Sequence, residues 1–480
     1  MSAHDIASSP PLATTRLARA RSHRWAALPV VLAGTFMVVL DFFIVNVAMP
    51  AMQADLQAST GAIEWVVAGY GLTFATLLIT AGRLGDQHGR RRMFSLGLAL
   101  FTVASAACGL AWSPTALVVA RLAQGVAAAL LSPQVLSIIG VAYTGADRVR
   151  ALSVYGIVLG LAAVGGQLVG GVLVQADVLG LGWRSCFLIN VPIGAAALAL
   201  VAHVVPESRA ERSSRLDITG TALVTAGLTA VVLPLVEGRQ HGWPLWTWLS
   251  LAAAPAILLA FAAHQRRLAR RGGAPLLDPI LFRERAFTAG LLTQLVFWCG
   301  QASFFLVLAL YLQLGRGLDA LRAGLVFTIL AVAYLAASMK APKLAPRLGR
   351  RLPALGALVL AAGHALLAAS VAGVGTTGPV GLLAPALLLV GAGMGLVITP
   401  LTATVLGSLE PQRAGAAAGA LSTMQQVGNA LGVAVTGVVF FGALHGGFAH
   451  AFEISLVQLA VLCVAVAGLT RLLPPPAGAS

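Results

Sequence analysis

Charge is the scarcest property of this chain. Only 10% of its 480 residues are Asp, Glu, Lys or Arg, whereas 58% are hydrophobic and the mean hydropathy is +0.89. Soluble domains carry roughly a quarter charged residues. The composition therefore excludes an ordinary soluble fold and predicts a polytopic membrane protein.

Cysteine, lysine and catalytic motifs are also scarce. The four cysteines lie in apolar stretches and have neither disulfide nor metal-ligand spacing. The two lysines, Lys340 and Lys343, lie outside any G-x-x-x-x-G-K-[ST] loop, which excludes ATP as the energy source. H-E-x-x-H and G-x-S-x-G are absent and the histidines are not clustered. We therefore expect no enzyme activity, no metal and no cofactor.

Long apolar runs are what the chain does contain. A helix that crosses a bilayer needs about 20 mostly apolar residues. Scanning for such runs predicts fourteen spans, at 26–49, 62–82, 93–112, 115–138, 151–175, 185–205, 217–236, 245–264, 287–312, 322–340, 352–373, 379–405, 414–441 and 452–472.

Basic residues orient these predicted spans. If the N-terminus is inside, the outer loops contain only Arg184, Arg239, Arg316 and Arg322, Arg121 lies within the fourth span, and every other Lys and Arg is inside. The positive-inside rule therefore favours fourteen helices with both termini cytoplasmic. The same rule explains the net charge of +15 without a nucleic-acid partner. The apolar run after residue 24 is too long for a signal peptide, so residues 1–24 are expected to be a cytoplasmic tail.

A short repeat divides the chain. GRLGDQHGRRRM (82–93) follows the second span and PKLAPRLGRRL (342–352) follows the tenth, and they align at an offset of 260. Transporters are often built from such duplicated units. We predict a tail (1–24), a six-helix bundle (25–205), a linker with two extra helices and a basic loop (206–286), a second six-helix bundle (287–472) and a tail (473–480).

The first copy of this loop resembles the G-x-L-x-D-x-x-G-R-R/K signature of the major facilitator superfamily. LDFFIVNVAMP (40–50), RLAQGVAAA (121–129), WRSCFLINVPIG (183–194) and the stretch 411–435 are similar to its fourteen-helix drug:proton antiporter branch, which includes quaternary-ammonium and multidrug efflux pumps. The resemblance implies an all-α major facilitator fold, two six-helix bundles plus two inserted helices, in a multi-pass protein of a bacterial cell membrane.

The function that this resemblance implies is proton-coupled export of hydrophobic or amphiphilic drugs by alternating access, with the proton gradient as energy source. The expected partners are the amphiphilic substrate, protons and lipid, and the expected functional unit is a monomer. Export of one endogenous metabolite, or proton-coupled import on the same fold, stays open because fold does not fix substrate.

Asp41 is the acidic residue that lies deep in an apolar run, where a carboxylate is costly unless paired, hydrated or protonated. Asp41 lies about 15 residues into a helix that starts at the inner surface, which places it roughly 22 Å from that surface. Arg121 lies about six residues into a helix that starts at the outer surface, which places it roughly 9 Å from that surface. In a core of about 30 Å these depths nearly coincide. We predict that the two residues pair. The resemblance implies a role in proton coupling, and a fixed structural ion pair is the alternative.

Three further groups of residues are candidates for the transport mechanism. The loop residues Gly82, Asp86, Gly89 and Arg90 match the family's gating motif, with simple anchoring as the alternative. Gly156, Gly160, Gly166 and Gly170 form small-xxx-small pairs that permit close helix packing, although the family motif G-P-x-x-G-G here reads GQLVGG, with Gln167 for proline. In the ninth span, Gln294, Trp298, Gln301 and Phe305 share one helical face, and we predict that this face lines the substrate cavity.

Overall fold

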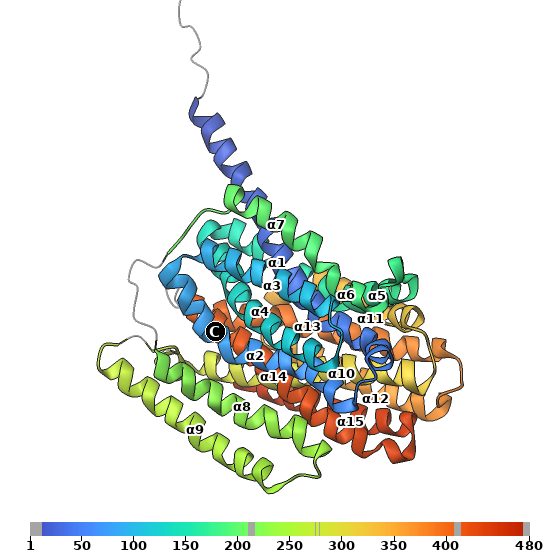
Figure 1. Cartoon of the computed structure of the whole chain (residues 1–480). Helices are drawn as coiled ribbons and strands as arrows, with labels where there is room; N and C mark the ends of the chain where they lie inside the picture. Colours follow the sequence, from blue (N-terminus) through green and yellow to red (C-terminus); the bar gives the residue numbers. More distant parts are fainter. Residues whose placement is uncertain (1–11, 210–216, 274, 278, 408–413, 474–480) are drawn as a thin grey trace, which may run out of the picture.

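The computed structural model describes residues 12–473 except 210–216, 274, 278 and 408–413, and the described residues form helices joined by short turns (Figure 1). The helices are α1 (Leu12–Leu56), α2 (Thr60–His88), α3 (Arg90–Gly109), α4 (Pro114–Ala142), α5 (Gly145–Ala176), α6 (Ser185–Leu188), α7 (Asn190–Val204), α8 (Ile218–Gln240), α9 (Leu245–Arg270), α10 (Arg285–Leu310), α11 (Ala320–Leu348), α12 (Arg351–Val374), α13 (Ala384–Gly407), α14 (Ala414–Gly442) and α15 (Phe448–Leu469).

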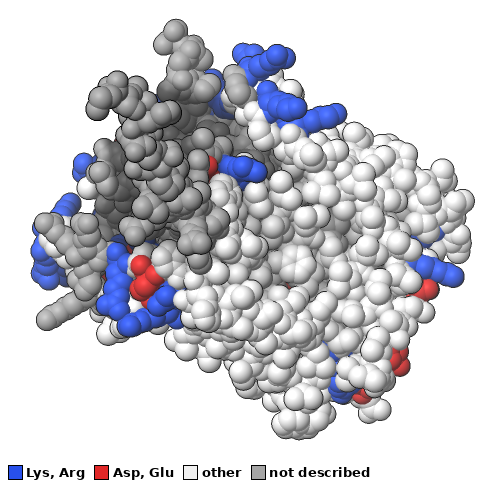
Figure 2. All heavy atoms as spheres, turned by 90° about the horizontal axis from the view of Figure 1, so that it is seen from above, with Lys and Arg blue, Asp and Glu red and all other residues white. Residues whose placement is uncertain are grey.

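Fourteen segments within the described ranges are long and apolar enough to cross a membrane. Each overlaps one predicted span, and α6 with α7 together make the sixth. Figure 2 shows charged side chains gathered toward opposite margins of one face, with a broad uncharged band between them. Such a band is what a hydrocarbon core requires.

Polar side chains at helix starts explain where several spans begin. Ser59 and Ser113 accept hydrogen bonds from the Ala62 and Ala116 amides at the starts of α2 and α4, and Asp319 accepts one from the Arg322 amide at the start of α11. These caps satisfy amides that have no partner within the helix. α2 ends at His88 and is followed by Gly89, whose φ of +105° few other residues adopt.

Glycine brings five of the helices into close contact. A side chain at Gly166 or Gly170 of α5 would collide with or press on α1 near Ile44, and one at Gly171 would lie 2.4 Å from the Ala320 carbonyl oxygen of α11. On the other side, a side chain at Gly432 of α14 would lie 2.0 Å from the Cys299 carbonyl oxygen of α10. Backbones this close make α5 and α14 the tightest contacts of α1 and α10.

α8 and α9 lie as a pair at the edge of the bundle (Figure 1). α8 is hydrogen-bonded to α2 near both ends, through Thr80 and Thr221, whose hydroxyl oxygens are 2.9 Å apart, and through Trp65, whose indole N–H donates to Glu237. Against α14, α8 contributes apolar packing, with Val232 beside Ala430 and Ala434. α8 is therefore attached to α2 by hydrogen bonds and apolar packing, and to α14 by apolar packing.

Asp217 fixes the start of α8. Its carboxylate accepts hydrogen bonds from the Gly220 amide (2.8 Å) and the Gln265 amide group (2.6 Å), and lies 2.7 Å from His264 Nε2. Burial alone would raise the pKa of Asp217, but these hydrogen bonds outweigh it and lower the pKa below its usual value. The ionised carboxylate thus joins α8 to α9.

Candidate functional site

Asp41 and Arg121 form an ion pair between α1 and α4. Arg121 Nη1 donates to Asp41 Oδ2, and both side chains are 0% exposed. The geometric prediction that the two residues lie at one depth and pair is confirmed. A buried ion pair is stable only when hydrogen bonds satisfy its remaining atoms, so the surroundings of the two residues decide what the pair can do.

Three polar side chains complete the network around the carboxylate. Gln124 of α4 donates to Asp41 Oδ1 (2.8 Å) and accepts from Arg121 Nη1 (2.7 Å). Asn190 of α7 donates to Asp41 Oδ1 (3.0 Å), and both amides also donate to the Ser105 hydroxyl oxygen of α3. The sequence analysis did not identify Gln124, Asn190 or Ser105. Side chains of α1, α3, α4 and α7 therefore form one hydrogen-bond network around the Asp41 carboxylate.

Arg121 is also held from the side of α2. Its Nε donates to the Val66 carbonyl oxygen (2.8 Å), and its guanidinium carbon lies 4.2 Å above the centre of the Tyr70 ring. A cation over an aromatic face is stabilised by about 2 kcal/mol or more when it is desolvated. The arginine is therefore fixed in position even apart from its bond to Asp41.

A cavity lies beside this network, between helices from both ends of the chain. Its free volume in this conformation is about 50 Å³. Drug-sized ligand sites typically measure about 300 to 1,000 Å³, so the cavity is largely closed in this conformation. Its lining comes from α1, α2, α5, α10, α11, α13 and α14: Val38, Val39, Phe42, Phe43, Phe74, Leu159, Gly160, Ala163, Trp298, Gln301, Phe305, Tyr334, Met394, Ile398, Gln425, Gln426 and Asn429.

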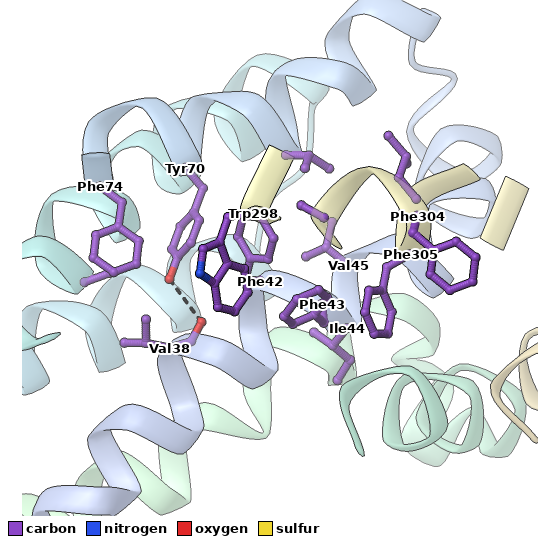
Figure 3. Packing of buried hydrophobic residues seen from close by; sticks show 14 of the residues in the cluster. Val38, Phe42, Phe43, Ile44, Val45, Tyr70, Phe74, Trp298, Phe304 and Phe305 are labelled. Carbon is purple, nitrogen blue, oxygen red and sulfur yellow. Dashed lines mark hydrogen bonds between the residues drawn. The ribbon is translucent and has the colours of Figure 1, made fainter. Parts of the chain in front are cut away.

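Tyr70 connects the ion pair to the cavity wall. Its hydroxyl donates to the Val38 carbonyl oxygen of α1 (3.2 Å), and its ring centre is 6.1 Å from that of Phe42 (Figure 3). Val38 and Phe42 line the cavity, and Asp41 lies between them on the same helix. Tyr70 therefore contacts both the ion pair and two residues of the cavity wall.

Three of the four residues predicted to form the cavity face of α10 line this cavity, and its use by a substrate stays a prediction. Trp298, Gln301 and Phe305 line the cavity, and the Phe305 ring packs 4.8 Å from that of Phe43 (Figure 3). Gln294 is buried but is not one of the lining residues. It lies one turn nearer the start of α10 than Trp298.

The predicted gating loop joins α2 to α3. Asp86 and Arg90 form an ion pair at 2.9 Å, and the Arg91 amide donates to Glu207, just after α7 (3.1 Å). A side chain at Gly89 would lie 2.6 Å from the Glu207 carboxylate, whereas one at Gly82 would make only an ordinary contact. The φ of +105° favours glycine at position 89, whereas the Glu207 carboxylate is the end of a flexible side chain that can move aside. Neither condition applies at position 82. The gating role of this loop stays a prediction.

The predicted interface glycines of α5 face two different helices. Gly166 and Gly170 meet α1, and a side chain at Gly160 would overlap the Tyr334 ring of α11. Gly156 is half-buried. Gln167, in place of the motif proline, is buried and donates to the Phe43 carbonyl oxygen (3.1 Å). The amide therefore ties α5 to a cavity-lining residue of α1.

A family model described as Major Facilitator Superfamily matches residues 31–433. The chain belongs to the major facilitator superfamily, a family of membrane transporters and not of enzymes. The family resemblance, the all-helical fold and the multi-pass membrane location are thereby confirmed.

Named bacterial relatives include export and resistance proteins. The chain is 42% identical to the "Probable actinorhodin transporter" of Streptomyces coelicolor, over 88% of this chain and 73% of that protein. It is 38% identical to the "Cephamycin export protein CmcT" of Amycolatopsis lactamdurans, over 94% and 93%. It is 37% identical to the "Puromycin resistance protein pur8" of Streptomyces alboniger, over 88% and 82%.

Solved structures support the fold. A D-xylose-proton symporter superposes with a TM-score of 0.67 at 15% identity, over 95% of this chain and 99% of that chain. A POT family transporter superposes with a TM-score of 0.64 at 16% identity, over 92% and 94%. At these identities the likeness concerns the fold alone.

Proposed function

We propose that this protein exports amphiphilic drugs or antibiotics across the cell membrane in exchange for protons. The observation that carries the proposal is the fully buried Asp41–Arg121 pair, linked through Tyr70 to a cavity that is lined by aromatic and amide side chains. The names of the relatives, which include export and resistance proteins for several antibiotics, support the same class of substrate.

Asp41 is the proton-binding group in this proposal, and Arg121 controls its affinity. With the carboxylate ionised, Arg121, Gln124 and Asn190 all donate to it. Protonation removes the charge that attracts the guanidinium, while the bond from Arg121 to the Val66 carbonyl remains. α1 is then free to shift relative to α4, which changes the cavity wall at Val38 and Phe42. Substrate binding against that wall acts on Asp41 in reverse, because coupling between two sites is reciprocal.

The proposed orientation places both termini in the cytoplasm, as the basic loops favour. The bundles 25–205 and 287–472 are proposed as the two moving halves, with 206–286 as the linker that contains α8 and α9. The 82–90 loop is the proposed cytoplasmic gate, and the working unit is a monomer. The Asp86–Arg90 pair would hold this gate in one conformation and release it in the other.

Accumulation of dyes and antibiotics in pump-deficient bacteria, with and without an uncoupler, tests the proposal. We expect expression of the protein to lower accumulation and the uncoupler to abolish the effect. Asp41→Asn should return accumulation to the level of cells without the protein, because the amide cannot exchange a proton, while the variant remains in the membrane fraction.

Asp55→Asn is the matched control. Asp55 also lies on α1 and also pairs with an arginine, Arg184 at 2.6 Å, but its side chain is 47% exposed. This change should leave export intact. Uphill export by Asp41→Asn would contradict the role of Asp41. Unchanged accumulation of a broad panel by the wild-type protein would contradict drug export and favour a single metabolite as substrate.

A further inference from the structure

The central cavity contains no charged side chain. Among the described residues that line it, none is Asp, Glu, Lys, Arg or His. Asp41 is near in sequence to the lining residues but faces α4 and α7, where Arg121 and Gln124 of α4 and Asn190 of α7 occupy its oxygens. A cation that left water for this cavity would lose its hydration and gain no counter-ion, which is strongly unfavourable.

The two walls of the cavity differ in chemistry. The wall from α1, α2 and α5 is apolar and includes the aromatic rings of Phe42, Phe43 and Phe74. The opposite wall, from α10 and α14, carries an indole N–H and amide groups: Trp298, Gln301, Gln425, Gln426 and Asn429. The cavity therefore matches a molecule with one apolar face and one hydrogen-bonding edge.

Several polar atoms of that second wall have no hydrogen-bond partner in the protein. They are Trp298 Nε1, Gln301 Oε1, Gln426 Oε1 and Asn429 Oδ1. Trp298 is 8% exposed, and Gln301 and Asn429 are each 3% exposed. Buried polar atoms are nearly always hydrogen-bonded in proteins, so unpartnered ones gathered on one cavity wall indicate groups that bind a ligand. A flip of any amide exchanges an acceptor for a donor without adding charge.

We propose that the transported molecule is an uncharged, flat aromatic compound with hydroxyl or amide groups along one edge, and that permanent cations are poor substrates. The proposal rests on the export function proposed above and specifies its substrate class. The aromatic body would pack on Phe42 and Phe43, and the polar edge would bond to Trp298, Gln301 and Asn429.

This substrate class separates the two binding events. The proton binds at Asp41, behind the cavity wall, and the substrate binds at groups that do not titrate. The two ligands therefore do not compete for one carboxylate, and exchange of a neutral molecule for protons moves net charge across the membrane. Transport should respond to the membrane potential as well as to the pH gradient.

Two probes of similar size test the proposal on the purified full-length protein and on everted vesicles. The first is a neutral trihydroxyanthraquinone and the second is ethidium, a permanent cation. We expect the neutral probe to bind at least about tenfold more tightly and to be the probe driven by an imposed pH gradient. O-methylation of its hydroxyl groups should weaken binding about fivefold for each hydrogen bond lost.

Gln301→Glu places a carboxylate in the cavity at nearly constant shape. It should raise ethidium binding and transport at least about tenfold and reduce binding of the neutral probe. Gln301→Met, which removes the amide without adding charge, should weaken the neutral probe about fivefold and leave ethidium unchanged. Asn429→Asp adds the same charge from α14 and serves if the Gln301→Glu variant does not reach the membrane.

The outcomes separate this proposal from the export function. Binding of the neutral probe with no gradient-driven movement of either probe supports the ligand class and contradicts export. Gradient-driven movement of ethidium by the wild-type protein, equal to or faster than that of the neutral probe, upholds export and overturns the ligand class.

Discussion

The contact of α2 with α4 and the contact of α11 with α13 share a close glycine approach but differ in chemistry. A side chain at Gly125 of α4 would lie 2.4 Å from the Tyr70 carbonyl oxygen of α2, and one at Gly391 of α13 would lie 2.2 Å from the Leu330 carbonyl oxygen of α11. Tyr70 and Leu330 differ by the offset of 260 that relates the two loop repeats. The two pairs of helices are therefore equivalent in packing.

The residues around these crossings diverge. Four positions before Gly125 is Arg121, and four positions before Gly391 is the fully buried Leu387. The position that matches Asp41 at the offset of 260 is Gln301. One half therefore has a buried ion pair where the other has a leucine and an amide. The difference indicates that the first half binds the proton and the second half supplies the polar side of the cavity.

Converting the first half to the chemistry of the second should have the largest effect. Arg121→Leu leaves Asp41 buried without a counter-charge, and removal of one partner of a buried pair costs about 3 to 5 kcal/mol. We expect a large fall in the midpoint of thermal unfolding of the detergent-purified protein. Leu387→Met, at the equivalent position, should cost less than about 1.5 kcal/mol.

The double variant Asp41→Gln with Arg121→Leu sharpens this comparison. It removes both charges, and neutral replacements of a buried pair are often close to neutral in stability. Most of the lost stability should return while proton-driven export stays absent. A single Arg121→Leu variant as stable as the wild type would show that the pair is not the buried contact described above.

The glycine contacts of the two halves should respond unequally. A side chain at Gly432 would lie 2.0 Å from the Cys299 carbonyl oxygen, whereas one at Gly166 would lie 3.1 Å from the Leu40 carbonyl oxygen. Gly432→Ala should cost about 1 to 3 kcal/mol of stability because backbone must move, and Gly166→Ala should cost less. Thermal unfolding in detergent measures both.

Gly437→Ala is the control for these two variants. It lies on α14, in open space, so the added methyl group meets no neighbour. Alanine is the better helix former by about 1 kcal/mol, and the variant should be no less stable than the wild type. Equal losses in all three variants would contradict the assignment of close helix contacts.

The smallest expected effect concerns the link between ion pair and cavity. Tyr70→Phe removes the hydrogen bond to the Val38 carbonyl oxygen and keeps the ring beneath Arg121. The loss of stability should be about 0.5 to 1.5 kcal/mol. If Tyr70 transmits the state of Asp41, the ratio of protons to substrate moved in vesicles should fall while substrate binding is retained. An unchanged ratio of protons to substrate would show that Tyr70 does not connect Asp41 to the cavity, and that α1 is the connection.

The sequence predicted the helices and the central pair because both depend on position along the bilayer normal. Segment length and basic loops define fourteen spans, and counting residues from each end places Asp41 and Arg121 at one depth. The rotation of each helix about its axis is not determined by such counting. Asn190 and Ser105 therefore could not be assigned to the site. Gln124 could have been, because it follows Arg121 by three residues and so lies on the same face of the helix.

The cavity was predicted less completely for the same reason. The face of Gln294, Trp298, Gln301 and Phe305 is continuous along α10, but the sequence does not tell where along that face the helices separate. Gln426 and Asn429 lie in a stretch that matched the family, yet nothing in the pattern indicated that their amides face the cavity. The contact between Gly89 and Glu207 joins residues more than a hundred positions apart and carries no local signal.

The attachment of α8 has a practical consequence for measuring the transport cycle. Because α8 is hydrogen-bonded to α2 at both ends and meets α14 through apolar side chains, the α8–α9 pair should travel with α2. Trp248 of α9 is 57% exposed and lies outside the two bundles. A fluorescent or spin label at this position can be paired with a second label on α12. The distance between the two labels would report the tilt of one bundle against the other without disturbing the cavity.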